Sequence, residues 1–252
     1  MIKSLFSGIT GLQANTEALG VIGDNIANVT TYGFKSGRLD FANLLNQSVG
    51  GYTGQEVGSG VTAANLSRDW TQGSIENTSN ATDLAVNGRG FFVVQDENGN
   101  EYYTRAGNFH FDKDGYLVDN YGYKVQGTEG DLQLSDTTGA TSMSISSTGE
   151  ITAFSSGDTT GTSVGTITLA TFACDWGLAA MDRNMYTTTN QSGDASKGAP
   201  GTGGKGSVSG YSLEMSNVDL ASQFGKMITT QRSFQAAAKV VTASDEVLQQ
   251  LL

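Results

Sequence analysis

The chain contains one histidine and one cysteine, residue types that readily act as a base or a nucleophile near neutral pH. His110 stands between Phe109 and Phe111, which predicts a strand whose imidazole is exposed on the face opposite the two rings. Cys174 follows Phe172 in an apolar run and is predicted to be a small buried residue. One cysteine excludes an internal disulfide and a cysteine-based zinc site. No Ser–His–Asp set can be argued around His110.

Other residues that could do chemistry lie in short segments rich in turn formers. A calcium-binding EF-hand loop needs ligands at alternating positions and a Glu at its twelfth position. Asp96–Asn100 and Asp112–Gly115 lack that spacing and are predicted to be hairpin turns. Asn87–Gly90 is glycine-rich but lacks the Lys-Ser/Thr ending and the following helix of a phosphate-binding loop. We therefore expect no catalytic, cofactor-binding or metal-ligating residue and no enzymatic activity.

Composition excludes several classes of partner. The net charge is −11, from 25 acidic and 14 basic residues, and no Lys/Arg cluster that could hold nucleic acid is present. No apolar stretch reaches the roughly 20 residues needed to span a bilayer, so membrane insertion is not expected. Ser7, Thr10 and Gln13 interrupt any hydrophobic region near the N-terminus, so no cleaved secretory signal peptide is expected and any export would use another route.

Two predicted helices, one near each end of the chain, are the first elements that could position a functional surface. Apolar residues recur every seven positions near both ends, which predicts helices over about residues 3–28 and 217–251 with coiled-coil seams. The predicted seam residues are Leu5, Ile9, Leu12, Leu19, Ile26, Leu220, Phe224, Met227, Phe234, Val241 and Leu248. Ser216 or Asn217 is the predicted cap of the second helix, with Asp219 completing a variant of the capping box.

Neither predicted helix is strong by itself. Gly8, Gly11, Gly20 and Gly23 each cost about 1 kcal/mol relative to Ala. Isolated helices owe most of their stability to packing. The two helices could therefore pair within one monomer to close a domain, or they could order only against neighbouring subunits, and the periodicity favours neither interpretation.

The middle of the chain is predicted to be β-rich. The whole chain has 34 glycines, one proline and only 15% charged residues, and in its middle short apolar runs alternate with turn formers. Strands are predicted at Phe91–Gln95, Tyr102–Arg105, Phe109–Asp112, Tyr116–Val118, Tyr121–Val125, Met143–Ile145, Glu150–Phe154 and Val164–Phe172. Residues 155–163 and 193–209 are predicted surface loops. The predicted fold class is a mainly β central domain of short antiparallel strands, residues 57–210, with a paired helical layer formed by residues 1–56 and 211–252.

Three groups of motifs carry a resemblance to a known family. They are Ser7–Leu12 with Val21–Val29 and Thr31–Lys35, then Asp83–Phe92 with Tyr103–Phe109, and finally Glu214–Leu220 with Gln231–Gln235. These stretches resemble the flagellar rod and hook proteins, and they frame nearly the whole chain. The resemblance implies a structural subunit whose terminal segments form the inner coiled-coil layer of a hollow helical tube, with the β domain outside.

The resemblance also implies partners and a location. The partners are further copies of the chain, adjacent rod and hook–filament junction proteins, the hook cap and the flagellar export apparatus. The location is the flagellar hook or basal body, extracellular or, for a rod subunit, periplasmic. Thr31–Gly37, the short connection from Leu45 to Val57 and the ending Ser244–Leu248 favour a hook subunit. A distal rod subunit is the alternative.

Two other classes of protein remain as alternatives. A secreted β-rich adhesin or binding module would explain the composition but leaves the two heptad repeats without a purpose. A hydrolase with an unrecognised acidic site would need an activated nucleophile, and the sequence offers none.

Overall fold

The computed structural model describes residues 2–44, 47–48, 56–134, 140–155 and 161–251. The chain divides into two compact units, each built from segments far apart in sequence. Unit 1 comprises residues 1–29, 35–69 and 218–252, and unit 2 comprises residues 30–34 and 70–217. The domain boundaries drawn from sequence, at 57 and 210, stay a prediction.

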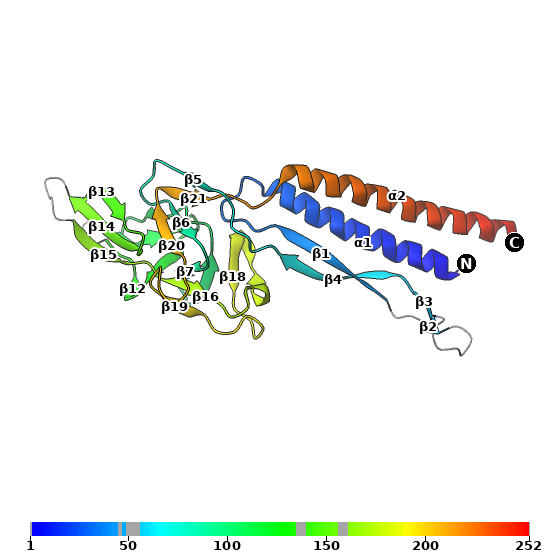
Figure 1. Ribbon diagram of the computed structural model, residues 1–252, viewed down its shortest axis with the longest axis horizontal. Coiled ribbons are helices and arrows are strands. Elements are labelled where there is room, and N and C mark those ends of the chain that lie inside the picture. The colour runs from blue at the N-terminus through cyan, green and yellow to red at the C-terminus, as the bar shows by residue number, and fades with distance from the viewer. Residues whose placement is uncertain (1, 45–46, 49–55, 135–139, 156–160, 252) are drawn as a thin grey trace. The chain divides into compact units, whose positions relative to one another are not determined.

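Unit 1 is a helix pair with a two-stranded ribbon along it (Figure 1). Its elements are α1 (Ile2–Ala27), β1 (Gly37–Asn43), β2 (Gln47–Ser48), β3 (Glu56–Val57), β4 (Val61–Arg68) and α2 (Leu220–Leu251). β1 and β4 pair antiparallel with an irregularity between Asp40 and Phe41. Sequence reasoning missed this ribbon, and the part of the predicted Leu45–Val57 connection at 45–46 and 49–55 lies outside the described residues.

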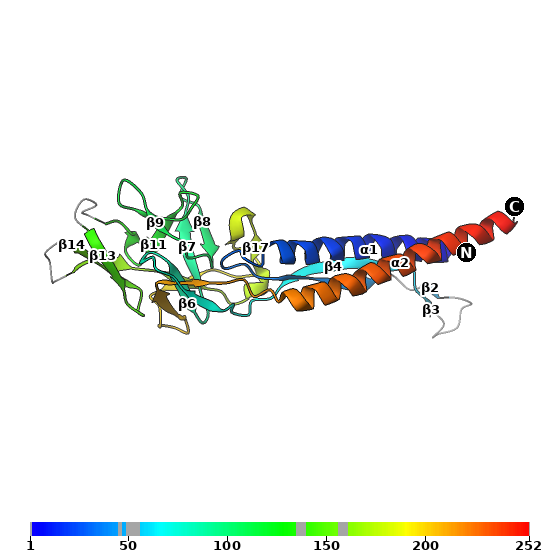
Figure 2. The ribbon, with the colours of Figure 1, turned by 90° about the horizontal axis from the view of Figure 1, so that it is seen from above.

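The two helices run antiparallel, with both chain ends at the same end of the pair (Figures 1 and 2). The Ser4 and Ser244 hydroxyls lie 3.3 Å apart, and Asn25 Nδ2 donates to Gln223 Oε1 at 3.4 Å. The glycines that weaken α1 allow this close contact. A Cβ built on Gly8 would lie 2.8 Å from Val241 Cγ2, and one on Gly11 would lie 3.7 Å from Ala237 Cβ.

The start of α2 corrects one prediction. The helix begins at Leu220, and Asp219 Oδ1 accepts a hydrogen bond from the Ala221 N–H at 3.1 Å. Asp219 is therefore the cap, in place of Ser216 or Asn217, because its side chain reaches one of the N–H groups that the first turn leaves without an intrahelical acceptor.

Unit 2 is β-rich, with 17 strands β5–β21 and two short 3₁₀ turns, η1 and η2, among its described residues. The first two strands are β5 (Ile75–Asn77) and β6 (Leu84–Asn87). They are followed along the chain by β7 (Phe91–Gln95), β8 (Glu101–Thr104), β9 (His110–Phe111), β10 (Leu117–Val118), β11 (Lys124–Gly127) and β12 (Gly130–Asp131). The later elements are β13 (Ala140–Ile145), β14 (Glu150–Ser155), β15 (Thr162–Thr166), β16 (Leu169–Thr171), η1 (Asp175–Gly177), β17 (Ala179–Ala180), η2 (Asp182–Asn184), β18 (Met185–Thr187), β19 (Ser196–Gly198), β20 (Ser207–Gly210) and β21 (Ser212–Glu214).

The largest sheet follows the order β17-β18-β8-β7-β11-β10-β9, with β12, β16 and β19 attached to it. β13, β14 and β15 form a second sheet, and two further pairs are β20 with β6 and β21 with β5. All of these pairings are antiparallel. The predicted fold class, a mainly β middle with terminal helices that pack together, is confirmed.

Strand β7 is buried on both faces. This burial explains why its apolar run is continuous. Phe92 and Val94 join one apolar cluster with Leu84 and Phe109, while Phe91 and Val93 join another with Tyr186. Alternate side chains of a strand point to opposite faces, so a strand between two clusters needs apolar residues at every position. The predicted strand Phe91–Gln95 matches β7 residue for residue.

Three other predictions meet a clear outcome in unit 2. His110 is exposed between the buried Phe109 and the half-buried Phe111, as predicted. Cys174 was predicted to be buried but is exposed, because β16 ends at Thr171 and the chain leaves the sheet for η1. The predicted loop over 193–209 contains β19 and part of β20, while the predicted loop over 155–163 lies largely outside the described residues.

Candidate assembly surface

The helix pair of unit 1 buries few large apolar residues and leaves many of them at the surface. Ala14, Ala18 and Ile22 are buried on α1, whereas Gln223 and Ser244 are the buried positions of α2. The large apolar side chains left exposed on the two helices are Phe6, Ile9, Leu220, Phe224, Ile228, Phe234, Val240 and Val247. A soluble monomer rarely exposes so many large apolar groups together, and such surfaces mark interaction sites.

The predicted seam residues fall on this incompletely covered surface. Ile9, Leu220, Phe224 and Phe234 are exposed. Leu5, Leu12, Leu19, Ile26, Met227, Val241 and Leu248 are half-buried. The contact between α1 and α2 thus leaves every predicted seam residue at least partly accessible, and their role in assembly stays a prediction.

Gly8 and Gly11, where α1 comes close to α2, belong to a pattern of small residues that sequence reasoning missed. Gly8, Gly11, Ala14 and Ala18 recur at intervals of three or four along α1, a spacing that places small residues on one helix face. That spacing was the signal that could have identified the contact face. The large apolar residues at seven-residue intervals predicted a neighbouring face instead.

Asn25 fastens the ribbon of unit 1 to α1. Its Nδ2 donates to the Gly37 carbonyl at 2.8 Å, and its Oδ1 accepts from the Gly37 N–H at 2.8 Å. The side-chain amide thereby pairs with the first residue of β1 as a neighbouring strand would. Because Asn25 is buried and also donates to Gln223, one side chain links α1, β1 and α2.

A groove runs beside this contact within unit 1. Its volume is about 180 Å³, and its walls include Val21 and Ile22 of α1, Leu39 and Phe41 of β1, and Lys226 of α2. Phe41 and Leu66 are half-exposed aromatic and aliphatic groups on the ribbon. The ribbon therefore extends the apolar surface of the helix pair.

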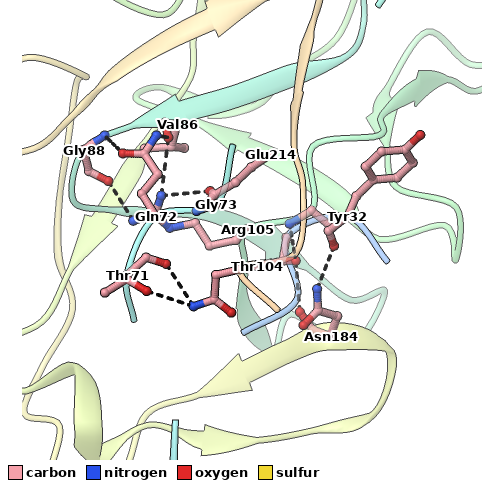
Figure 3. Close-up of polar contacts among 12 residues, drawn as sticks. Tyr32, Thr71, Gln72, Gly73, Val86, Gly88, Thr104, Arg105, Asn184 and Glu214 are labelled. Carbon is pink, nitrogen blue, oxygen red and sulfur yellow. Dashed lines mark hydrogen bonds and ion pairs between the residues drawn. The ribbon is translucent and has the colours of Figure 1, made fainter. Parts of the chain in front are cut away.

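A second constellation, within unit 2, is the buried ion pair of Arg105 and Glu214 (Figure 3). Arg105 Nη1 lies 3.2 Å from Glu214 Oε2, and Nη2 donates to the Gly88 carbonyl at 2.8 Å. Glu214 Oε1 accepts from the Gly73 N–H at 3.0 Å. Burial lowers the pKa of the Arg105 guanidinium, and the Glu214 carboxylate opposes that shift. We call Gly73, Arg105 and Glu214 with their contacts the clamp.

The clamp also receives the segment Thr30–Phe34. The Gly33 N–H donates to the Glu214 carbonyl at 2.7 Å, and a Cβ built on Gly33 would lie 2.5 Å from the Arg105 carbonyl carbon. Gly33 has φ +66°, so only glycine fits both the conformation and the space. Asn184 Nδ2 donates to the Tyr32 carbonyl at 2.9 Å, which adds a second attachment (Figure 3).

The clamp gathers the segments of unit 2 that continue into unit 1 along the chain. Residues 30–34 are held by Glu214 and Asn184, and Gly73 is held by Glu214. Asn217 Nδ2 donates to the Thr71 carbonyl at 3.2 Å. Tyr32–Lys35, Arg105 and Glu214 lie in the motifs that carry the family resemblance, but the sequence predicted no contact between them.

Two features of the described residues bear on metal binding and membrane insertion. No group of three or more His, Cys, Asp or Glu side chains among them is placed to hold a metal ion. No helix in the described part of the chain is long and apolar enough to cross a membrane. What these surfaces offer is contact: unit 1 has an incompletely covered apolar helix pair, and unit 2 holds residues 30–34 and Gly73 by hydrogen bonds of its own.

Comparison with known proteins gives three family matches along the chain. Residues 5–35 match the family described as "Flagella basal body rod protein". Residues 85–153 match "Flagellar hook protein FlgE/F/G D1 domain", and residues 209–252 match "Flagellar basal body rod FlgEFG protein C-terminal". The matches cover α1 from residue 5 onward, the clamp's Arg105 and Glu214, and all of α2.

Individual relatives match over the whole chain or over part of it. The chain is 38% identical to the flagellar basal-body rod protein FlgG of Bacillus subtilis (strain 168), over 100% of this chain and 98% of the relative. It is 35% identical to the protein of the same name from Caulobacter vibrioides, over 98% of this chain and 96% of the relative. It is 41% identical to the flagellar hook protein FlgE of Borreliella burgdorferi, over 50% of this chain and 31% of the relative.

Proposed function

This chain belongs to the family of flagellar basal-body rod and hook proteins, and from that premise we propose that it is a structural subunit of the distal rod. The observation that carries the proposal is coverage. The rod relatives align with this chain from end to end, whereas the hook relative aligns with half of it and uses less than a third of its own length. The distal rod therefore replaces the hook as the preferred role.

The size argument supports the same choice. Additional outer domains in the middle of a hook protein would leave a large unaligned part in the relative, and the match to only 31% of the hook relative has that form. The rod relative leaves almost nothing unaligned. Of the three features that favoured the hook, Ser244–Leu248 lies in a C-terminal region whose family description names FlgE, FlgF and FlgG together, and most of Thr31–Gly37 lies in a region that matches a rod family. The third, the short connection from Leu45 to Val57, lies outside all three matched regions.

The subunit's work in a rod would be mechanical, with no enzymatic step. The apolar surface of α1 and α2 would be covered by neighbouring subunits to form the inner layer of a tube. The predicted seam residues would supply this contact, with further copies of the chain and adjacent axial proteins as partners. The glycines of α1 suit a chain that is exported unfolded and gains stability from subunit contacts.

Electron microscopy of flagellar basal bodies from cells that lack this chain tests the role. A truncated rod is expected for a distal rod subunit. A complete rod without a hook would restore the hook interpretation, and an unaltered rod and hook would overturn both.

Substitution of Leu12 and Phe234 by Asp tests the surface used. Each change places a charge where an apolar contact is proposed, so polymers should be lost while unit 2 keeps its fold. Polymers of normal length from the double variant would exclude these two residues from the inner contact. An exposed polar pair, Gln13→Asp with Gln235→Asp, is the matched control on the same two helices.

A further inference from the structure

The charges of the two helices in unit 1 are divided by sign. Between residues 4 and 27, α1 carries two charged residues, Glu17 and Asp24, and both are acidic. Between residues 220 and 244, α2 carries three, Lys226, Arg232 and Lys239, and all are basic. Over most of their length, α1 is therefore the acidic helix of the pair and α2 the basic one.

The two carboxylates of α1 lie on the side of that helix that faces away from α2. The close contact with α2 is made at Gly8, and Glu17 follows nine positions later, about two and a half turns, which brings it to the opposite side. Asp24 lies seven positions beyond Glu17, about two turns, on the same stripe. Both side chains are exposed. We call this stripe the acidic edge of the helix pair.

Two of the basic residues of α2 are placed in the same way, on the side that faces away from α1. Gln223 is buried and accepts from Asn25 of α1, and Arg232 follows Gln223 by nine positions, again about two and a half turns. Lys239 lies seven positions beyond Arg232, and both side chains are exposed. We call this stripe the basic edge. Lys226 is not part of it, because Lys226 lines the groove beside β1.

Within the described part of the chain, none of the four edge charges has an ion-pair partner. Asp24 Oδ1 accepts a hydrogen bond from the neutral Asn28 side chain at 2.9 Å. The helix pair thus presents two unpaired carboxylates along one side and two unpaired cations along the other.

Each edge also carries a large exposed apolar side chain. Phe6 precedes Glu17 by eleven positions, and Ile228 precedes Lys239 by eleven, about three turns in both cases. Phe6 is 55% exposed and Ile228 is 54% exposed. An interface that covers these apolar groups takes the neighbouring charges out of water, which is costly unless each charge meets an opposite one. The surface that covers either edge must therefore carry charges of the other sign.

We propose that the acidic edge of one copy docks on the basic edge of a second copy, so that α1 of each subunit contacts α2 of the next. The second copy is the occupant because the chain itself carries both complementary surfaces. Docking of an edge on the same edge of another copy would bring like charges together. The apolar side chains supply affinity, and the charges decide which edge meets which.

The placement of the two edges fits a polymer. They lie on opposite sides of one helix pair, so the contact joins two different surfaces and repeats from copy to copy, which generates a ring or a helical filament. The charges on each edge are spaced alike, at seven positions or about 10.5 Å, so both can be paired at once. This inference rests on the proposed function, since it requires copies of the chain to lie side by side.

The test expresses full-length variants in cells that otherwise lack the chain and counts complete rods by electron microscopy of isolated basal bodies. The acidic-edge variant is Glu17→Lys with Asp24→Lys, and the basic-edge variant is Arg232→Glu with Lys239→Glu. Each should lower the count about tenfold or more, because like charges then meet at every contact. A normal count from either variant would overturn the proposal.

Two combinations separate a contact between copies from one within a copy. The quadruple variant carries opposite charges on its two edges and should recover rods. Co-expression of the two double variants should also recover rods, because one has two basic edges and the other two acidic edges, so each can dock only on the other. Failure of the quadruple variant would show that the two edges do not meet. Recovery in the quadruple variant alone would place the contact within one copy, and either result would overturn the proposal.

The matched control keeps the charges and exchanges the side chains. Arg232→Lys with Lys239→Arg should leave the number of rods unchanged, whereas a loss as large as that of the basic-edge variant would show that shape and not charge governs the contact. The rod role is judged separately, from the basal bodies of cells that have no copy of the chain, and it stands if the charges prove unimportant.

Discussion

Arg105 and Glu214 form an ion pair 3.2 Å long although 109 positions separate them in sequence, and their side chains are 7% and 0% exposed. Taking two charges out of water is costly, and the pair persists because each partner has further hydrogen bonds. Arg105 donates to the carbonyls of Val86 and Gly88, and Glu214 accepts from the Gly73 N–H. The pair therefore specifies how three distant segments of unit 2 meet.

Removal of one partner should be more harmful than removal of both. Arg105→Met leaves the Glu214 carboxylate buried without its cation, so unit 2 should lose about 3–5 kcal/mol of unfolding free energy. The double variant Arg105→Met/Glu214→Gln should recover part of that loss, because no uncompensated charge remains. Urea denaturation followed by tryptophan fluorescence measures both.

The control for this pair is the more exposed contact between Lys124 and Asp131. Lys124→Met should cost no more than about 1 kcal/mol, because water screens an exposed pair. Equal losses from Arg105→Met and Lys124→Met would show that burial does not give the clamp its importance.

Gly33→Ala tests the attachment of residues 30–34. The new methyl would meet the Arg105 backbone at 2.5 Å, in a conformation with φ +66°. We expect a loss of about 2 kcal/mol or more in the stability of unit 2, since backbone cannot move aside as a side chain can. Gly20→Ala is the opposite case: no atom lies within 4 Å of its added Cβ. It should stabilise α1 by about 1 kcal/mol. A lower unfolding temperature for Gly33→Ala and a higher one for Gly20→Ala would confirm both expectations.

Gly8→Leu tests the close contact of α1 and α2. Even the first added carbon would lie 2.8 Å from Val241 Cγ2, so a leucine must push the helices apart. We expect an earlier loss of helical circular dichroism on heating, despite the better helix propensity of leucine. Gly23→Leu, at a helix position with open space around it, supplies the comparison. A gain of helix stability in Gly8→Leu would mean that the helices do not need this contact.

Tyr103 should make unit 2 sensitive to alkaline pH. Burial, helped by the charge of Glu101 and by a hydrogen bond to it, raises the pKa of Tyr103 to about 12 from 10.0. The folded state therefore favours the neutral phenol. This contribution to stability is fully present below about pH 10 and is lost as the pH rises through about 12.

Urea unfolding between pH 9 and pH 12, with tyrosinate absorbance as a second measurement, checks this expectation. Tyr103→Phe should flatten the fall in stability above pH 10, whereas Tyr121→Phe, at an exposed tyrosine, should not. A fall of the same size in wild-type protein and Tyr103→Phe would assign the alkaline transition to another group.

Several elements could be read from local pattern. The seven-residue repeats at both ends predicted two helices, and α1 and α2 agree within a few residues. The apolar run Phe91–Val94 and the turn at Asp96–Gly99 predicted a hairpin, which β7 and β8 form. These features depend on residues close in sequence, whose period and turn chemistry constrain the backbone directly.

Other elements could not be read in this way. β4 carries polar residues such as Asn65 and Ser67 without a clear alternation, and the alternation in β1 is limited to Leu39 and Phe41, too short to mark a strand by itself. Cys174 lies in sequence beside a buried strand, yet the strand ends three residues earlier and leaves the thiol exposed. Pairing with a distant segment decided that β1 and β4 are strands. The point at which such pairing ends decided that Cys174 is exposed.

The sequence by itself determined the family, the fold class, the two helices and most of the central hairpins. It left open whether the helices pair within one subunit or order only against neighbouring subunits. The tertiary structure alone decided which helix face is used within the subunit: the contact is made at Gly8, Gly11 and Asn25, and Ile9 and Phe224 stay exposed. It alone joined Arg105 to Glu214. A periodic pattern states which residues share a face, but only close approach of the partner, set by the smallest side chains, states which face is buried.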